Sequence, residues 1–189
     1  MITAILLAAG QSKRMHGENK LSKKVHGVPL IKHSINNILT SSVDELVVVL
    51  GYQKEIIEKL IDKNKNIRIV YNKDFETGMA SSIKTGLDNL SKKTENFFIC
   101  LGDMPMVNKN TYNQLIQSRN KKDIIIPIFK GQQGNPVLFS MLMREKIMSI
   151  QGDAGAKKIL KDNEDKIFNL EINDSGISQD FNTADNFIL

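Results

Sequence analysis

The chain is poor in the residues that build covalent or metal-held scaffolds. Its 189 residues include one cysteine, Cys100, and no tryptophan. A single cysteine excludes an intrachain disulfide and a metal site made of several cysteines, and the three histidines are too few and too unfavourably spaced for a zinc motif. The early apolar run at residues 2–9 follows no basic residue and is too short to cross a bilayer. We therefore expect a soluble cytoplasmic protein with no membrane partner.

Composition and charge are those of a globular protein. Hydrophobic residues make up 41% and charged residues 25%, and the net charge is 26 − 21 = +5. Five basic residues lie between Lys13 and Lys24 against one acid, Glu18. No aromatic residue falls in that window, which argues against stacking of single-stranded nucleic acid. An anionic small molecule is the better match for this local excess of positive charge, so we expect no nucleic-acid partner.

Short apolar runs alternate with segments of helical period. The runs predict buried strands at Ile2–Leu7, Glu45–Leu50, Ile67–Tyr71, Asn96–Leu101 and Asp123–Ile128. The periodic segments predict helices at Pro29–Leu39, Gln53–Asp62, Met79–Leu90 and Asn110–Ser118. The second half is less regular, and predicts a strand at Asn135–Phe139, helices at Ser140–Ile150 and Ala154–Leu160, and an edge strand at Lys166–Leu170.

This alternation is typical of right-handed βαβ units around a mostly parallel sheet. We predict an α/β fold: a Rossmann-like three-layer sandwich in one domain covering residues 1–189. In such open sheets, ligands bind at the carboxyl ends of the strands. Candidate functional residues are therefore those that directly follow a predicted strand.

The loop after the first strand has the composition of a phosphate-binding turn. The small residues 8–10 let the backbone approach a ligand, and Gly10 can adopt a positive φ. Successive N–H groups in such a turn attract phosphate oxygens. Arg14 and Lys20 then supply two cations to a triphosphate, and Ser12 supplies a hydroxyl donor. The alternative is a tight strand-to-helix connection without a ligand.

Two common nucleotide motifs are absent from this loop. The G-x-G-x-x-G motif requires glycine at position 12, where the chain has Ser12, and no Gly-Lys-Ser/Thr sequence is present. NAD-dependent dehydrogenases and P-loop ATPases are thereby disfavoured.

The loop belongs to a series of motifs spread over nearly the whole chain. These motifs are Leu7-Ala8-Ala9-Gly10-Gln11-Ser12-Lys13-Arg14-Met15 with Lys20, Thr77-Gly78-Met79-Ala80-Ser81-Ser82, Leu101-Gly102-Asp103-Met104-Pro105, Gly134-Asn135-Pro136-Val137-Leu138-Phe139, Gly152-Asp153-Ala154-Gly155-Ala156 and Asp180-Phe181-Asn182-Thr183-Ala184-Asp185. In this order they resemble the nucleotidyltransferases that attach a nucleotide to molybdopterin. The Ala8-Ala9 pair is more similar to the CTP-using branch, since guanylyltransferases tend to carry glycine at the position of Ala9.

The resemblance implies a nucleotide-diphospho-sugar transferase-like fold and Mg²⁺-dependent transfer of CMP from CTP to the phosphate of molybdopterin, with release of pyrophosphate. Asp103 ends a buried strand, where a Mg²⁺ ligand belongs, and matches the family's metal-binding aspartate; capping of the next turn is the alternative. Near the C-terminus the resemblance implies a second metal ligand at Asn182, with Asp180 two residues earlier. A role for Asn182 at a helix start is about equally compatible with the pattern.

The resemblance also assigns the nucleoside and acceptor contacts. Leu7, Ala8 and Ala9 contact the base through the backbone, and Asn72 with Ser81 or Ser82 binds base or ribose. Gly134-Asn135-Pro136 stands on the acceptor side, where the family often has Gly-His-Pro. Asp153 either helps to form a second anion site or, by preference, caps the helix that follows it.

Few acid–base groups are required for such a reaction. The second pKa of a phosphate monoester is about 6, so the acceptor is already largely ionised at neutral pH. We therefore expect Arg14, Lys20 and Asp103 to be the catalytic residues, and Cys100 to be a buried apolar residue.

Three alternatives remain open. One is a cytidylyltransferase for a sugar or alditol phosphate, and another is the guanylyl homologue. The third is a non-catalytic carrier of the molybdenum cofactor. A molybdenum hydroxylase apoenzyme is a partner implied by the resemblance alone.

Overall fold

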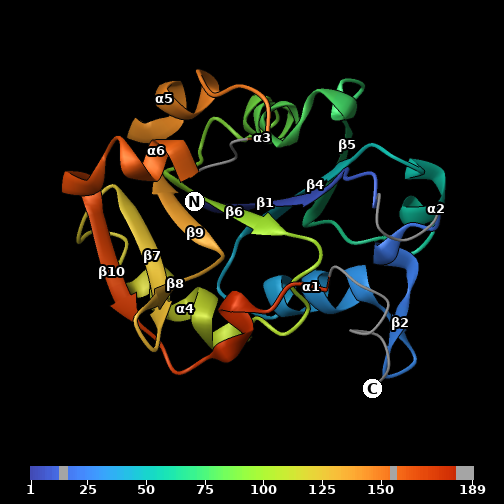
Figure 1. The fold of residues 1–189 in the computed structure, drawn as a ribbon, viewed down its shortest axis with the longest axis horizontal. Coiled ribbons are helices and arrows are strands. Elements are labelled where there is room, and N and C mark those ends of the chain that lie inside the picture. Colours follow the sequence, from blue (N-terminus) through green and yellow to red (C-terminus); the bar gives the residue numbers. More distant parts are fainter. Residues whose placement is uncertain (13–16, 154–156, 182–189) are drawn as a thin grey trace.

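The computed structural model describes residues 1–12, 17–153 and 157–181 (Figure 1). Its centre is an eight-stranded sheet with the order β10-β7-β9-β6-β1-β4-β5, with β8 paired to β7. The strands are β1 (Ile2–Ala8), β4 (Glu45–Leu50), β5 (Ile67–Tyr71), β6 (Asn96–Leu101), β7 (Ile124–Phe129), β8 (Gln132–Gln133), β9 (Val137–Ser140) and β10 (Ile167–Glu171). The helices are α1 (Leu30–Leu39), α2 (Lys54–Glu58), α3 (Met79–Asp88), α4 (Lys109–Gln117), α5 (Arg144–Met148) and α6 (Lys157–Lys161).

The sheet is mostly parallel, as predicted. β1 pairs in parallel with both β4 and β6, β4 with β5, and β7 with β10. β9 is antiparallel to its neighbours β6 and β7, so these two neighbours run in the same direction. The carboxyl ends of all the parallel strands therefore meet at one edge of the sheet.

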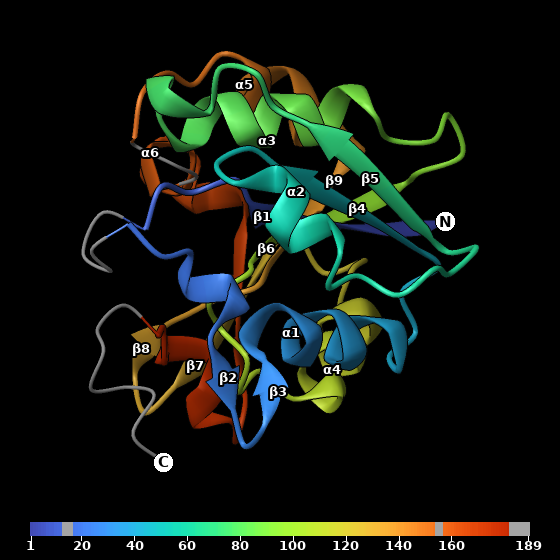
Figure 2. The ribbon, with the colours of Figure 1, turned by 90° about the vertical axis from the view of Figure 1, so that its right-hand side faces the viewer.

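Helices cover both faces of the sheet, which confirms the three-layer prediction. α1 and α4 lie on one face, and α3 and α5 lie on the other (Figure 2). The strands alternate between these faces: Ala4 and Leu6 of β1 join the core under α1, and Ile5 joins the core under α3. Gly86 of α3 lies against Ile5, where a Cβ would collide with the isoleucine side chain, so this glycine lets the helix approach the sheet closely.

Several local elements differ from the sequence predictions. α2 ends at Glu58, four residues short of the predicted end, and a small hairpin of β2 (Lys24–Val25) and β3 (Val28–Pro29) was not predicted. The hairpin turn has His26 at φ 49° and Gly27 at φ 79°, the signs required by a type I′ turn. His33 of α1 contacts this hairpin through Nε2, 2.9 Å from the carbonyl oxygen of Val25.

In the described part of the chain, no helix has the length and apolar character needed to traverse a bilayer.

Candidate functional site

A cleft of about 460 Å³ opens at the carboxyl edge of the sheet. It lies between the loop after β1, the loop after β6 and the start of α3. Its lining residues are Leu7, Ala8, Ala9, Gly10, Gln11, Ser12, Lys20, Leu21, Phe75, Glu76, Gly78, Met79, Ser82, Leu101, Asp103, Asp153 and Asp180. The structure thus brings together most of the described residues that the sequence motifs single out.

The backbone of the loop after β1 is fixed from both neighbouring strands. The N–H of Gly102 after β6 donates to the carbonyl of Leu7 at 3.0 Å, and the N–H of Tyr52 after β4 donates to that of Ala9 at 3.2 Å. Among residues 9–12 of this loop, Ser12 has a left-handed backbone at φ 50° and Gly10 does not have a positive φ, which corrects the expectation for Gly10. The Ser12 hydroxyl accepts from the N–H of Lys20 at 3.1 Å, so the serine links the loop to the lysine.

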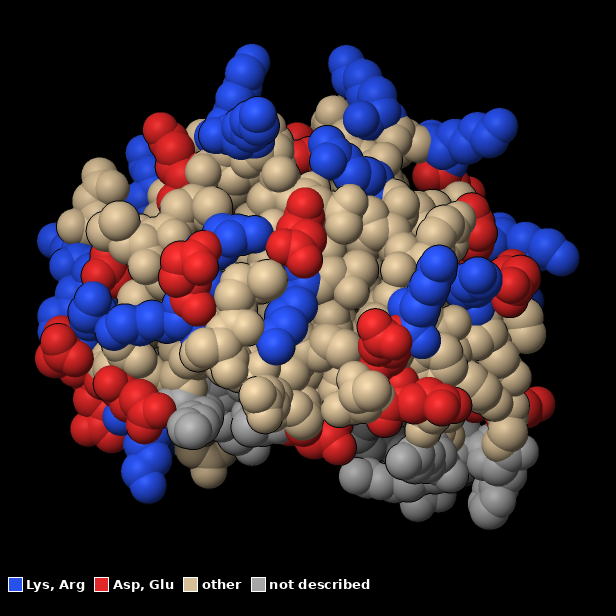
Figure 3. Space-filling view, turned by 90° about the horizontal axis from the view of Figure 1, so that it is seen from above, with Lys and Arg blue, Asp and Glu red and all other residues tan. Residues whose placement is uncertain are grey.

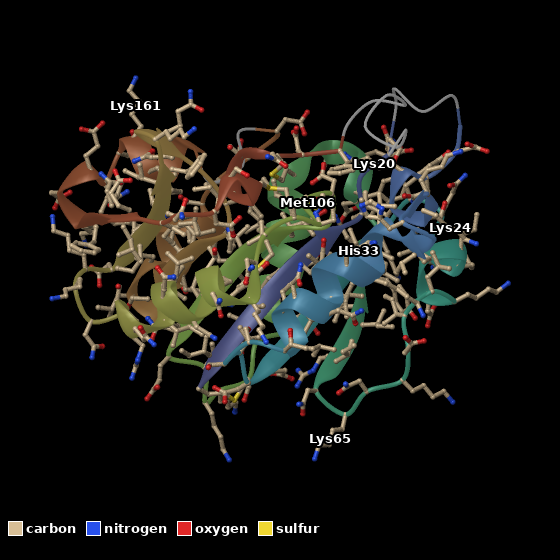
Figure 4. All side chains as sticks on the ribbon, turned by 90° about the horizontal axis from the view of Figure 1, so that it is seen from below. Lys20, Lys24, His33, Lys65, Met106 and Lys161 are labelled. Atoms are coloured by element: carbon tan, nitrogen blue, oxygen red, sulfur yellow. The ribbon has the colours of Figure 1, made fainter. Side chains whose placement is uncertain are left out.

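Lys20 and Asp103 form an ion pair in the cleft. Lys20 begins a 3₁₀ helix at Lys20–Ser22, close to the end of β1 (Figure 4), and Asp103 follows β6. Their side chains are only 18% and 16% exposed. A cation and a carboxylate that are largely withdrawn from water provide one group for phosphate oxygens and one for a divalent cation. Arg14 and Asn182 lie outside the described residues.

The C-terminal segment reaches the same wall of the cleft. The N–H of Phe181 donates to the backbone carbonyl of Asp103 at 2.9 Å, and Asp180 lines the cleft beside it. Within residues 1–12, 17–153 and 157–181, no three His, Cys, Asp or Glu side chains are grouped to hold a metal. Mg²⁺ commonly takes one or two carboxylates together with phosphate and water oxygens, so the lining carboxylates Asp103 and Asp180 have the chemistry required of ligands to such an ion.

Asn72 lies behind the cleft and does not line it. Its Nδ2 donates to the hydroxyls of Ser81 at 2.8 Å and Ser82 at 2.9 Å, and its Oδ1 accepts from the N–H of Asp74 at 2.9 Å. Its amide is therefore used inside the protein. We expected Asn72 to contact the nucleotide directly; in the structure its side chain instead positions the two serines. Ser81 donates onward to Gly78 and Asp74 carbonyls, so Ser82 is the serine of this pair that lines the cleft.

The Gly152–Asp153 turn docks onto the start of α3. The carboxylate of Asp153 accepts from the N–H of Met79 at 3.1 Å, and the carbonyl of Gly152 accepts from that of Ala80 at 3.0 Å. Gly78 has φ 111°, and a Cβ on it would lie 2.6 Å from the Gly152 carbonyl carbon, so glycine is required here. Asp153 thus caps α3, whereas the sequence favoured capping of the helix after it; residues 154–156 lie outside the described residues.

A second cavity of about 840 Å³ adjoins the cleft and shares Met79, Leu101 and Asp153 with it. Its far wall includes Asn135, which precedes a cis-proline, and the carboxamides of Gln133 and Asn169, hydrogen-bonded at 2.9 Å. Two substrates can therefore lie next to each other, one in each cavity.

Cys100 lies in β6 and lines neither cavity. Burial raises the pKa of its thiol, and this effect outweighs the opposing hydrogen bond with Tyr112. Burial also raises the pKa of Tyr112, with further contributions from Cys100 and Asp174. Both groups stay protonated at neutral pH, which agrees with the predicted apolar role of Cys100.

Acidic and basic side chains mix on the face that carries α3 and α5 (Figure 3). On the described residues of that face no continuous basic surface of the kind that follows a phosphate backbone is visible.

Comparison with known proteins identifies relatives for almost the entire chain. Residues 4–167 match the family model described as the MobA-like NTP transferase domain. The molybdenum cofactor cytidylyltransferase of Escherichia coli is 27% identical over 187 residues, covering 99% of this chain and 94% of that protein. The bifunctional protein GlmU of Caldicellulosiruptor saccharolyticus is 28% identical over 146 residues, but the chain spans only 31% of its length.

Solved structures share the fold at lower identity. Rv0371c from Mycobacterium tuberculosis superposes with a TM-score of 0.86 at 20% identity, over 98% of this chain and 94% of that chain. A manganese complex of Rv0371c superposes with a TM-score of 0.77 at 19% identity, over 90% and 88% of the two chains.

Proposed function

The chain belongs to the MobA-like NTP transferase family, and we propose that it transfers CMP from CTP to the phosphate of molybdopterin or its molybdenum-bearing form. The observation that carries the proposal is the Lys20–Asp103 pair in a cleft that continues into a second, larger cavity. The choice of CTP and of the acceptor is supported by Ala9 and by the end-to-end similarity to the E. coli cytidylyltransferase.

The reaction joins two phosphates. An oxygen of the acceptor phosphate forms a bond to the α-phosphorus of CTP. The bond from that phosphorus to the bridging oxygen breaks, and pyrophosphate leaves with the electron pair. The acceptor oxygen is ionised at neutral pH because the second pKa of a phosphate monoester is about 6, so no side chain has to remove a proton.

The protein then has to align the acceptor oxygen with the α-phosphorus and to neutralise the charge on the reacting phosphates. The ammonium of Lys20 faces the charge that develops on the phosphoryl oxygens, and the N–H groups of the loop after β1 add fixed dipoles. The nucleoside extends from this loop toward α3, where Ser82 lines the cleft. The acceptor occupies the second cavity, against Asn135.

Asp103 and Asp180 are the described residues that would hold Mg²⁺. When bound, the ion supplies positive charge to the triphosphate oxygens. The manganese complex of Rv0371c supports a divalent cation in this fold. Asn182 as a further ligand, and Arg14 as a second triphosphate cation, are retained as proposals from the sequence pattern.

Binding and turnover test the proposal separately. Thermal unfolding with CTP, GTP, ATP and UTP, each with and without Mg²⁺, measures nucleotide choice. A ligand at 100 times its Kd stabilises by about 2.7 kcal/mol, which is about 5–10 °C at this size. We expect selective, Mg²⁺-dependent stabilisation by CTP; a preference for GTP would place the protein with the guanylyltransferases.

Pyrophosphate release with molybdopterin, compared with a sugar phosphate, measures acceptor choice. Asp103→Ala is expected to lower the transfer rate by about 10²–10³-fold, by analogy with loss of an oxyanion donor. Asp62→Ala, which removes an 83% exposed carboxylate outside the cleft, is the matched control. Near-normal transfer by Asp103→Ala would contradict the metal assignment, and absence of pyrophosphate release with every acceptor would favour a non-catalytic cofactor carrier.

A further inference from the structure

Two polar side chains meet across the mouth of the cleft at the α3 end. Gln11 of the loop after β1 donates through Nε2 to the Oε1 of Glu76 at 3.4 Å. Glu76 belongs to a 3₁₀ helix at Phe75–Thr77, directly before α3. Both side chains line the cleft, next to Phe75. None of the sequence motifs assigned a role to either of them.

Charge decides which part of a nucleotide can lie beside Glu76. A carboxylate repels the triphosphate, whose negative charge is matched by Lys20; the backbone of Lys20 bonds Ser12, whereas Glu76 bonds Gln11. The part of the ligand next to Glu76 is therefore the nucleoside. A carboxylate only accepts hydrogen bonds, so it requires a donor on that nucleoside.

Ser82 offers the opposite group on the same side of the cleft. Its hydroxyl oxygen already accepts from Asn72 at 2.9 Å, which directs its proton elsewhere, and the residue, 6% exposed, lines the cleft. The nucleoside end of the cleft thus combines an acceptor, Glu76, with a donor, Ser82. The cytosine edge presents the complementary pair: an amino donor at N4 and acceptors beside it.

We infer that Glu76 is a specificity-determining residue that accepts a hydrogen bond from the exocyclic amino group of the base and so discriminates cytosine from uracil. The inference rests on the proposed function. Uracil carries a carbonyl oxygen where cytosine carries the N4 amino group, so Glu76 would face an acceptor and would lose its hydrogen bond. Gln11 donates to this carboxylate at the mouth of the cleft and leaves its second oxygen available to the base.

The isosteric variant Glu76→Gln separates this role from folding. Glutamine keeps the size and exposure of the side chain but can turn its amide to donate to uracil or accept from cytosine. Glu55→Gln makes the same change on α2, at an exposed position outside the cleft, and is the matched control. The unfolding midpoint of each variant, measured without ligand, checks that the fold is retained.

The experiment is a titration of CTP and of UTP, with Mg²⁺, into the full chain and the two variants by calorimetry. The unmodified chain should bind CTP about tenfold more tightly than UTP, because one hydrogen bond to a charged group at a partly exposed site is worth about one decade in affinity. Glu76→Gln should bring the ratio of the two dissociation constants close to one, and Glu55→Gln should leave it unchanged.

Different failures contradict different claims. If Glu76→Gln keeps the full preference for CTP, or weakens both nucleotides equally as a ribose contact would, the role of Glu76 in base choice is wrong while the proposed function stands. If the unmodified chain binds neither cytidine nor uridine triphosphate, the proposed function fails and this inference fails with it.

Discussion

Replacing Asn72 by alanine tests how the start of α3 is held. Asn72 is 4% exposed and makes three side-chain hydrogen bonds, to Ser81, Ser82 and the N–H of Asp74. Each hydrogen bond of this kind contributes about 1 kcal/mol, and leaving buried partners unpaired costs at least as much. We therefore expect Asn72→Ala to lower the free energy of unfolding by about 3 kcal/mol.

Urea unfolding followed by circular dichroism measures this loss directly. A change of about 3 kcal/mol corresponds to about 6–12 °C in the thermal midpoint for a chain of this length. Asn120→Ala is the control, because Asn120 is exposed and surface substitutions stay within about 0.5 kcal/mol. A loss below about 1 kcal/mol would refute the view that the Asn72 network is a buried structural support.

The same variant also reports on Ser82. Without Asn72 the Ser82 hydroxyl is free to rotate, so CTP binding should weaken even at a temperature where the variant is fully folded. Unchanged CTP affinity in a folded Asn72→Ala protein would contradict the idea that Asn72 directs the Ser82 proton into the cleft.

Two further predictions concern the Lys20 ion pair and the buried thiol. Lys20→Met removes the partner of Asp103 and should tighten Mn²⁺ binding in the absence of nucleotide by roughly tenfold, measured from free Mn²⁺ by electron paramagnetic resonance. Lys23→Met, which breaks the more exposed pair with Glu18, should leave it unchanged, and equal Mn²⁺ affinity in all three proteins would contradict the prediction. Burial raises the pKa of Cys100 in the folded state, so above about pH 8.5 the unfolded state loses the thiol proton first and the free energy of unfolding should fall as pH rises. Urea unfolding between pH 7 and 10 should show a smaller fall for Cys100→Ala; the same fall in both proteins would disprove this.

The sheet was predictable because its central strands are buried on both faces. β4 and β6 have the predicted bounds, since each is an apolar run that burial on both faces requires. β5 also has the predicted bounds, although it is an edge strand with Arg68 and Tyr71 exposed. The hairpin of β2 and β3 was missed because strands of two residues carry no periodic signal. β8 was missed for the same reason.

The candidate site was predictable where its residues lie in the segments that follow neighbouring parallel strands. Lys20 and Asp103 meet because the carboxyl ends of β1 and β6 are adjacent in the parallel sheet. The hydrogen bonds of Asn72 could not be predicted from the order of the strands, because they depend on where α3 lies relative to β5. Asp153 caps a helix 74 residues earlier in the chain, and no local pattern reports a contact of that length.

The antiparallel strand β9 also affects which parts of the protein can be substituted independently of each other. It stands between β6 and β7, and so separates the strands whose loops build most of the first cleft from those whose loops build most of the second cavity. Apart from Gly152 and Asp153, which hold the start of α3, substitutions between β7 and β10 can therefore alter the second cavity while the loops after β1 and β6 stay intact. A chimaera that exchanges the walls of the second cavity but keeps Gly152, Asp153 and Asp180 should therefore retain the first cleft unchanged.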